Sequence, residues 1–282
     1  MAKHTQKFDT RQKMGKKTFE IFHYRDAKLS PVEVHHHDFY EIYYFLGGDV
    51  SYMIEGKKYK LNVGDIIFIN PKELHQPIVN SGSVYERIVL WIDRNYLASI
   101  SDGGADFVSC FKNKDIGNIL HTSVLMRGRI YELFIHIFRE VYGEDLGHEK
   151  YAEGILLQLL CELRRMVEES SETPPQKLDP PTLVGRVATY INDHYNEDIS
   201  LEMLAKKYFI SKYHLSHEFA EQVGVGLYRY LTLKRLSTAK ELLSDGVAAG
   251  EVARKCGFHN YPTFYRVFKA EYGISPSNFV NE

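Results

Sequence analysis

A duplicated pattern at a constant offset of 49 residues limits the folds open to the C-terminal part of this chain. The matching pairs are Ser211 and Asn260, Leu215 and Phe264, Phe219 and Phe268, Gly224 and Gly273, Val225 and Ile274, and Tyr230 and Phe279. Serine and asparagine cap the free amides at a helix start, and glycine accepts the left-handed turn at a helix end. Each copy therefore predicts a helix of about three turns whose apolar residues, at positions i and i+4, face the core.

A second, shorter helix is expected upstream of each capped helix, one beginning at Ser200 and the other near Ala249. Ala253 precedes Gly257 by four residues, a spacing that suits a close helix crossing followed by a sharp turn. This arrangement is typical of a helix-turn-helix unit. In the first copy Phe209 occupies the place of that glycine, so the first copy matches the pattern less closely.

The segment between the two copies, Leu227–Ser244, predicts one helix of 18 residues. At ~1.5 Å per residue such a helix is about 27 Å long. That length roughly matches the ~34 Å that separate two major-groove segments one turn apart on B-DNA. A chain with this layout is able to present two helices to adjacent segments of the groove.

Polar and small side chains lie on the face of each capped helix that points away from the predicted core. They are Lys212, Tyr213, Ser216, His217 and Ala220 on the first helix, and Tyr261, Pro262, Thr263, Arg266, Lys269 and Ala270 on the second. Arg266 suits bidentate contact with guanine, Ser216 and His217 suit base edges, and Tyr213 suits a thymine methyl group. The lysines and the helix N-termini suit phosphates. Each residue alone equally fits the solvated face of a helical bundle, but the constant offset argues against that alternative for the pair.

The N-terminal half has the composition of a β-protein followed by helices. Residues 18–97 are rich in β-branched and aromatic residues, divided by turn signals, which predicts an antiparallel sandwich or barrel. Residues 127–142 and 150–169 then follow a helical period. Their leucine-rich stripe is expected either to cover the barrel or to form a dimer interface; it consists of Ile155, Leu156, Leu159, Leu160 and Leu163. The proline-rich segment 168–181 then predicts an interdomain linker.

Several histidines and one carboxylate fall on one side of the predicted barrel. His35, His37, Glu41 and Tyr43 have the same parity along a strand, so their side chains share one wall of the interior. Together with His75, they have the chemistry to hold a divalent transition metal with open positions. The alternative is that they line a polar pocket or a solvated rim.

Aromatic residues are concentrated in the same region, which favours a ligand pocket. They are Tyr40, Tyr43, Tyr44, Phe45, Tyr52, Tyr59 and Trp91. Aromatic faces stack on sugar rings, although each of these side chains individually also fits ordinary core packing.

Two sets of motifs resemble known families. The second copy contains Gly257-Phe258, a Phe-x-Arg-x-Phe-Lys run from Phe264 to Lys269, and Gly-x-Ser-Pro from Gly273 to Pro276. On these motifs, residues 184–281 resemble the DNA-binding domain of AraC/XylS-type transcription regulators. Departures occur at His217 and Ala220, where that family usually has arginine and lysine, and at Ala249, where it has isoleucine.

The N-terminal motifs resemble those of cupins. His35, His37, Glu41 and Gly48 follow the first cupin motif closely. The second motif, formed by Gly64, Pro71 and His75, has one extra residue between the glycine and the proline.

The resemblances imply an α+β multidomain chain. The expected parts are a cupin-like effector-binding β-barrel at 1–110, a helical packing or dimerisation segment at 111–169, a linker at 170–181, and an all-α domain of two helix-turn-helix units joined by a long helix at 182–282. They imply a ligand-responsive, sequence-specific regulator of transcription. Its expected partners are double-stranded promoter DNA, a small carbohydrate-like effector and a second copy of the chain, with RNA polymerase as a further candidate.

The effector is expected to contact His35, His37, Glu41, Tyr43, His75 and Trp91. We expect no catalytic residue, no cofactor and no metal; a metal, if bound, would take His35, His37, Glu41 and His75 as ligands. One alternative is a metal-dependent cupin oxygenase or isomerase with a helical accessory domain. Another is an interaction module that keeps the helical fold without contacting DNA.

The remaining features exclude other classes of protein. No apolar run approaches the ~20 residues that cross a bilayer, and Met1–Lys17 lacks the apolar part of a signal peptide. A cytoplasmic protein without a membrane partner is expected. Cys110, Cys161 and Cys256 are few and far apart, which favours neither disulfides nor a cysteine zinc site. The net charge of −2 does not by itself indicate a nucleic-acid binder, so any basic surface is local.

Overall fold

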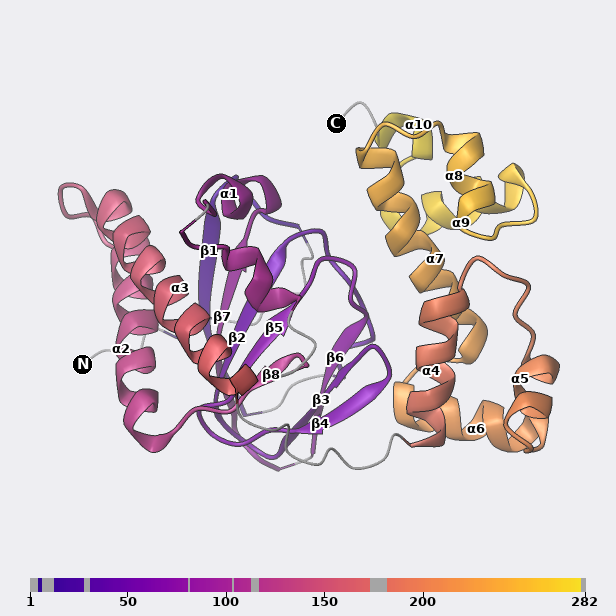
Figure 1. Cartoon of the computed structure of the whole chain (residues 1–282), viewed down its shortest axis with the longest axis horizontal. Coiled ribbons are helices and arrows are strands. Elements are labelled where there is room, and N and C mark those ends of the chain that lie inside the picture. The colour runs from indigo at the N-terminus through magenta and orange to yellow at the C-terminus, as the bar shows by residue number, and fades with distance from the viewer. Residues whose placement is uncertain are drawn as a thin grey trace.

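A computed structural model of the chain describes residues 5–6, 13–27, 31–80, 82–102, 104–112, 117–172 and 182–279. The N-terminal part is a β-barrel of two facing antiparallel sheets, and the C-terminal part is helical (Figure 1). The predicted α+β architecture with two parts is therefore confirmed.

The strands pair antiparallel into a five-stranded and a three-stranded sheet, in the orders β1-β7-β2-β5-β8 and β4-β3-β6. Their bounds are β1 Phe19–Asp26, β2 Tyr40–Gly47, β3 Val50–Ile54, β4 Lys57–Lys60, β5 Ile66–Ile69, β6 His75–Val79, β7 Tyr85–Ile92 and β8 Ile119–Leu120. Successive side chains on a strand point to opposite faces. On β2, Ile42 and Tyr44 therefore pack outward against helices, while Tyr43 and Phe45 pack inside the barrel.

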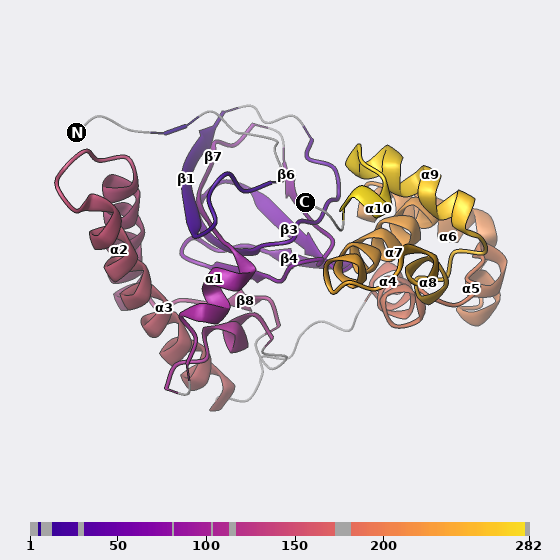
Figure 2. The same cartoon turned by 90° about the horizontal axis from the view of Figure 1, so that it is seen from above.

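Helices α2 (Val124–Val141) and α3 (His148–Glu172) cover the outer face of the five-stranded sheet (Figures 1 and 2). Two shorter helices, α1 (Arg94–Ser99) and η1 (Phe107–Phe111), complete this layer. None of the described helices is long and apolar enough to cross a bilayer.

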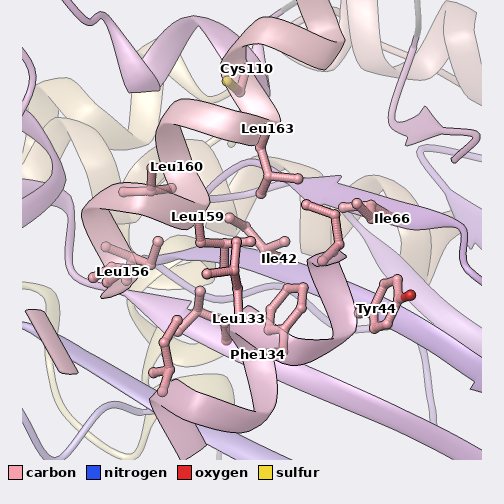
Figure 3. Packing of buried hydrophobic residues seen from close by; sticks show 14 of the residues in the cluster. Ile42, Tyr44, Ile66, Cys110, Leu133, Phe134, Leu156, Leu159, Leu160 and Leu163 are labelled. Atoms are coloured by element: carbon pink, nitrogen blue, oxygen red, sulfur yellow. The ribbon is translucent and has the colours of Figure 1, made fainter. Parts of the chain in front are cut away.

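The leucine-rich stripe of α3 lies inside the chain and not on a subunit surface. Leu156, Leu159 and Leu163 are fully buried against residues of the sheet and α2, such as Ile42 and Phe134 (Figure 3). The prediction of a dimer interface at this stripe is therefore wrong, because burial against the barrel already removes these side chains from water. The alternative prediction, that the stripe covers the barrel, is confirmed.

The C-terminal part contains the two expected units and the helix between them. Its helices are α4 Leu183–His194, α5 Leu201–Lys207, α6 Lys212–Val223, α7 Leu227–Ser244, α8 Ala249–Lys255, α9 Tyr261–Tyr272 and α10 Pro276–Phe279. The side chain of Ser211 accepts a hydrogen bond from the amide of His214 at 3.1 Å, and Asn260 accepts one from Thr263 at 2.9 Å. The predicted caps are thus confirmed, and α7 has the predicted bounds.

The linker expected at 170–181 is described only in part. Helix α3 continues through Glu172, and residues 173–181 lie outside the part of the chain that the structure describes.

The outer face of the three-stranded sheet packs against the C-terminal helices. Met53 on β3 and Leu74 beside β6 share a buried cluster with Val187 and Ile191 of α4. Polar contacts surround this cluster: the ammonium of Lys234 on α7 lies 2.6 Å from a carboxylate oxygen of Glu55. This wall of the barrel therefore has the barrel interior on one side and the C-terminal helices on the other.

Candidate nucleic-acid interface and barrel site

The outward face of α6 is accessible along its length. Lys212, Tyr213, Ser216, His217 and Ala220 are all exposed, with Tyr213 81% exposed. Leu215 and Phe219, on the opposite side, are fully buried. The predicted separation into a core face and an outward face is what the structure shows.

Acidic side chains lie among these residues of α6. Glu202 lies 3.6 Å from the ammonium of Lys212, and Glu221 lies 3.7 Å from His217. These carboxylates reduce the positive potential that DNA phosphates would meet at α6.

The outward face of α9 has a different electrostatic character. Tyr261, Pro262, Arg266, Lys269 and Ala270 are exposed, and Thr263 is half-buried. Pro262 stands in the first turn, where a helix has no use for its missing amide hydrogen. Among the described residues no carboxylate pairs with Arg266. Its guanidinium is therefore available to an anionic or base-edge partner.

The barrel interior brings the predicted effector residues together. An imidazole nitrogen of His37 lies 2.8 Å from a carboxylate oxygen of Glu41, and the ring of His75 lies 4.8 Å from that of His37. His35 pairs with His75 across adjacent segments, with ring centroids 4.4 Å apart. Burial lowers the pKa of His35 and His75, so both rings are neutral over a wider pH range than a solvated histidine.

Aromatic rings continue from this cluster across the interior. The ring of Phe39 stacks on that of His37, with centroids 3.9 Å apart, and its centroid lies 4.6 Å from that of the Trp91 ring. The ring centroids of Tyr43 and Tyr52 lie 5.2 Å apart in the same interior. Six predicted residues thus lie in one group of neighbouring side chains in the barrel: His35, His37, Glu41, Tyr43, His75 and Trp91.

Two of the aromatic residues assigned to a pocket by sequence lie elsewhere. Tyr40 and Tyr44 have even residue numbers on β2 and so face the opposite side from Tyr43. Tyr40 packs on η1 and Tyr44 on α2, outside the barrel. For these two side chains the alternative of core packing is correct.

Arg87 is a polar interior residue that the sequence analysis missed. Its side chain is fully buried on β7, is paired with Asp26, and lies 4.3 Å from the centroid of the Tyr85 ring. An arginine within the apolar run of β7 was the available signal, because a buried charge requires a partner. Nearby, the hydroxyls of Tyr43 and Tyr85 have no hydrogen-bond partner among the described residues. Burial raises the pKa of Tyr85 well above its usual range, so this hydroxyl remains a donor.

Comparison with known proteins gives matches over both parts of the chain. An AraC-like ligand binding domain matches residues 20–160, and a helix-turn-helix domain matches residues 204–282. The chain is 30% identical over 232 residues to the arabinose operon regulatory protein of Escherichia coli K12, covering 80% of this chain and 74% of that protein.

It is also 24% identical over 252 residues to the HTH-type transcriptional activator RhaS of Escherichia coli O81 strain ED1a, covering 86% of this chain and 85% of that protein. Among solved structures, ToxT from Vibrio cholerae aligns over 94% of this chain and 98% of that one, with a TM-score of 0.38 and 15% identity.

Proposed function

Because the chain belongs to the AraC family of transcription regulators, we propose that it binds a specific promoter sequence through α6 and α9 and a small hydroxylated effector inside the barrel. The observation that carries the proposal is the pair of capped helices with exposed outward faces, held at the two ends of the 18-residue α7. In helix-turn-helix proteins the N-terminal residues of such helices contact base edges. Lys212, Tyr213 and Arg266 lie in that half of their helices.

The two helices contribute unequally in this proposal. The outward face of α9 presents Arg266 and Lys269, whereas that of α6 carries acidic neighbours. We assign most of the phosphate and guanine contacts to α9, and assign Ser216, His217 and Tyr213 of α6 to base edges and methyl groups.

The experiment begins with selection of a binding site from random DNA duplexes by the full-length protein. Arg266→Ala should weaken binding to the selected site by about 1–3 kcal/mol, or roughly 5- to 150-fold, and relax the preference at one base pair. Lys212→Ala should weaken binding to all sequences alike. It should also lower the number of counterions released on binding by about one, measured from the slope of log K against log salt concentration.

The matched control is Lys150→Ala, which removes the same charge from α3, where the lysine is exposed and pairs with Glu153 of the same helix. DNA affinity should be unchanged in this variant. Binding by Arg266→Ala with wild-type affinity and specificity would remove α9 as the reader, and absence of any selected site would support the interaction-module alternative.

The side chains inside the barrel suit an effector with several hydroxyl groups. The faces of Phe39 and Trp91 suit a sugar ring, and the hydroxyls of Tyr43 and Tyr85 suit its oxygens. The relative from Escherichia coli is named for the arabinose operon. Titration of pentoses and hexoses, followed by Trp91 fluorescence, tests this assignment, and Tyr43→Phe should weaken the sugar that binds.

In the proposed role the barrel senses its ligand and does not transform it. Unchanged effector recovered after prolonged incubation is the expected result, whereas turnover would support the cupin enzyme. We also propose that the chain acts in the cytoplasm as a homodimer and contacts RNA polymerase when it activates transcription. Light scattering of the full chain tests the dimer, for which the buried face of α3 is not available.

A further inference from the structure

Helix α7 connects two units whose apolar side chains form two separate clusters (Figure 1). Its first half packs into the cluster of the first unit, α4 to α6, through Leu227, Tyr230, Leu231 and Leu233. Its second half packs into the cluster of the second unit, α8 to α10, through Leu236, Ala239 and Leu243. Apolar packing therefore fixes each unit to its own half of α7. It does not by itself fix the rotation of one unit relative to the other, because such packing is non-directional.

Arg235 lies at the boundary between these two halves of α7. Its guanidinium donates to the backbone carbonyls of Tyr195 and Glu197, in the turn that follows α4, at 2.7 Å each. The same guanidinium lies 5.8 Å from the centroid of the Phe258 ring, which is buried in the cluster of the second unit. A planar guanidinium whose donors form a fixed fork holds such partners in one relative orientation. Arg235 thus contacts both units at once.

The two turns that Arg235 joins also touch each other directly. Asn196, in the turn after α4, lies so close to Gly257 that a Cβ on this glycine would be 2.6 Å from the carbonyl oxygen of Asn196. A larger residue at position 257 would therefore push the two turns apart. Glycine permits the close approach that places the next residue, Phe258, beside Arg235.

A second charged contact joins the two units nearer the start of α7. Both Nη atoms of Arg229, in the first turn of α7, donate to the carboxylate of Glu271, in the last turn of α9, at 2.7 and 3.1 Å. Such a bidentate pair fixes direction as well as distance. The side chain of Arg229 is 48% exposed, so solvent weakens this contact more than it weakens the half-buried contacts of Arg235.

We propose that Arg235 is a positioning residue for DNA recognition, which fixes the phase between α6 and α9 so that the chain reads two half-sites at a single spacing. Arg229 supports the same geometry. One base pair inserted between the half-sites moves them apart by about 3.4 Å and rotates one relative to the other by about 34°. Hydrogen bonds to base edges do not tolerate such a displacement. The inference rests on the proposed function, because it requires both helices to read DNA.

The test uses the full-length protein and the duplex that it selects from random sequences. The base pairs at which Ser216→Ala and Arg266→Ala relax the preference mark the α6 and α9 halves of the site. One base pair is then inserted between the halves, and the affinities for the original and the lengthened duplex are measured for each protein. The ratio of the two affinities measures how rigidly the units are held, and it does not depend on the fraction of the protein that is folded.

The wild-type protein should bind the lengthened duplex at least about 10-fold more weakly than the original, because one unit loses its base contacts. In Arg235→Ala this ratio should fall below about 3-fold, since the two units are free to adjust to the new spacing. Binding of Arg235→Ala to the original duplex should also weaken several-fold, because the units are no longer pre-organised.

Lys234→Ala is the matched control. Lys234 precedes Arg235 on α7, carries the same charge, and lies 2.6 Å from the carboxylate of Glu55 in the barrel. Its removal leaves the contacts between the two units in place, so the ratio should equal that of the wild type. A ratio reduced as far as in Arg235→Ala would assign the effect to the charge of α7 and overturn the proposal.

Circular dichroism shows whether each variant is folded. If Arg235→Ala is not folded, Arg235→Lys decides, because lysine retains the charge without the planar fork. Its ratio should lie below that of the wild type, and a wild-type ratio overturns the proposal.

Equal ratios in the wild type and Arg235→Ala overturn the proposal, because a residue that only stabilises the fold would weaken binding to both duplexes alike. A wild-type protein that binds the two duplexes equally also overturns it, because α6 and α9 are then not held in one phase. Failure to select any site, or wild-type binding by both Ser216→Ala and Arg266→Ala, contradicts the proposed function instead.

Discussion

The side-chain amide of Gln76 on β6 donates a 2.9 Å hydrogen bond to the backbone carbonyl of Val223, in the last turn of α6. The bond joins the barrel to the C-terminal end of α6, whereas the residues of α6 to which we assign DNA contacts lie toward its N-terminal end. Tyr272 provides the corresponding contact at the end of α9, where its hydroxyl is hydrogen-bonded to His36 of the barrel at 2.9 Å. Both helices are thus held at their C-terminal ends while their N-terminal halves remain exposed.

Loss of the Gln76 bond should loosen the contact between the barrel and α6. Gln76→Ala leaves a buried carbonyl without its donor, which costs about 1–3 kcal/mol. We expect faster amide hydrogen exchange in β6 and the last turn of α6, measured by mass spectrometry. Gln222→Ala is the control, because Gln222 is exposed on the same helix and donates a hydrogen bond to Glu218 of that helix. Equal exchange in the two variants would contradict a coupling role for Gln76.

The turn of the first helix-turn-helix unit contains a strained residue whose replacement should stabilise the protein. Phe209 has a φ of 56° and is 94% exposed, whereas its counterpart Gly257 has a φ of 75°. A left-handed backbone is unfavourable for a residue with a Cβ, by roughly 1 kcal/mol or more, and glycine avoids this cost. Phe209→Gly should raise the free energy of unfolding by about 1 kcal/mol, measured by urea denaturation.

Two further variants separate backbone strain from loss of the aromatic ring. Phe209→Ala retains a Cβ, so it should give little or no stabilisation; a gain equal to that of Phe209→Gly would contradict the strain argument. Gly257→Ala should destabilise, because its Cβ would lie 2.6 Å from the carbonyl oxygen of Asn196.

The helix-turn-helix units were predictable because their signals are local. Ser211 and Asn260 accept hydrogen bonds from amides three residues away. The glycine at each helix end adopts the left-handed φ that other residues disfavour. The bounds of α7 follow from an uninterrupted helical segment between Gly226 and Asp245. The parity rule along the strands similarly placed His35, His37 and Glu41 on one wall.

Relationships between distant segments were not predictable in the same way. An apolar stripe such as that of α3 is the same whether it covers a sheet or a second subunit, and only the position of the sheet decides. The burial of Arg87 depends on pairing with Asp26, which lies on another strand. The contacts of His36 and Gln76 join residues more than a hundred positions apart, and no local pattern encodes them.

The buried stripe of α3 should contribute strongly to the stability of the chain. Leu159 is fully buried between the sheet and α2, and truncation of such a leucine to alanine costs about 2–5 kcal/mol. Leu157, two residues earlier on the same helix, is 39% exposed, so Leu157→Ala should cost less than about 1 kcal/mol. Urea denaturation of both variants measures the difference. A stable Leu159→Ala protein with an altered oligomeric mass would contradict the covering role.

The pair formed by His121 and Asp65 should make stability depend on pH. Nδ1 of His121 lies 2.9 Å from the carboxylate of Asp65, and this hydrogen bond raises the pKa of His121 above its usual 6.5. Because the folded state holds this proton more tightly, the stabilisation is complete below pH 6.5 and is lost as the pH rises through the higher folded pKa. The side chain of His121 is 55% exposed, so solvent limits the contribution to below about 1 kcal/mol.

Urea denaturation at about pH 5.5 and about pH 8.5 measures this contribution as a difference between wild type and variant. His121→Gln should remove a small stabilisation that is present only at the lower pH. His136→Gln, which changes an exposed histidine on α2, should leave the pH dependence as in the wild type. A variant His121→Gln that loses stability equally at both pH values would show that His121 acts through packing, because a contact independent of protonation has no pH window.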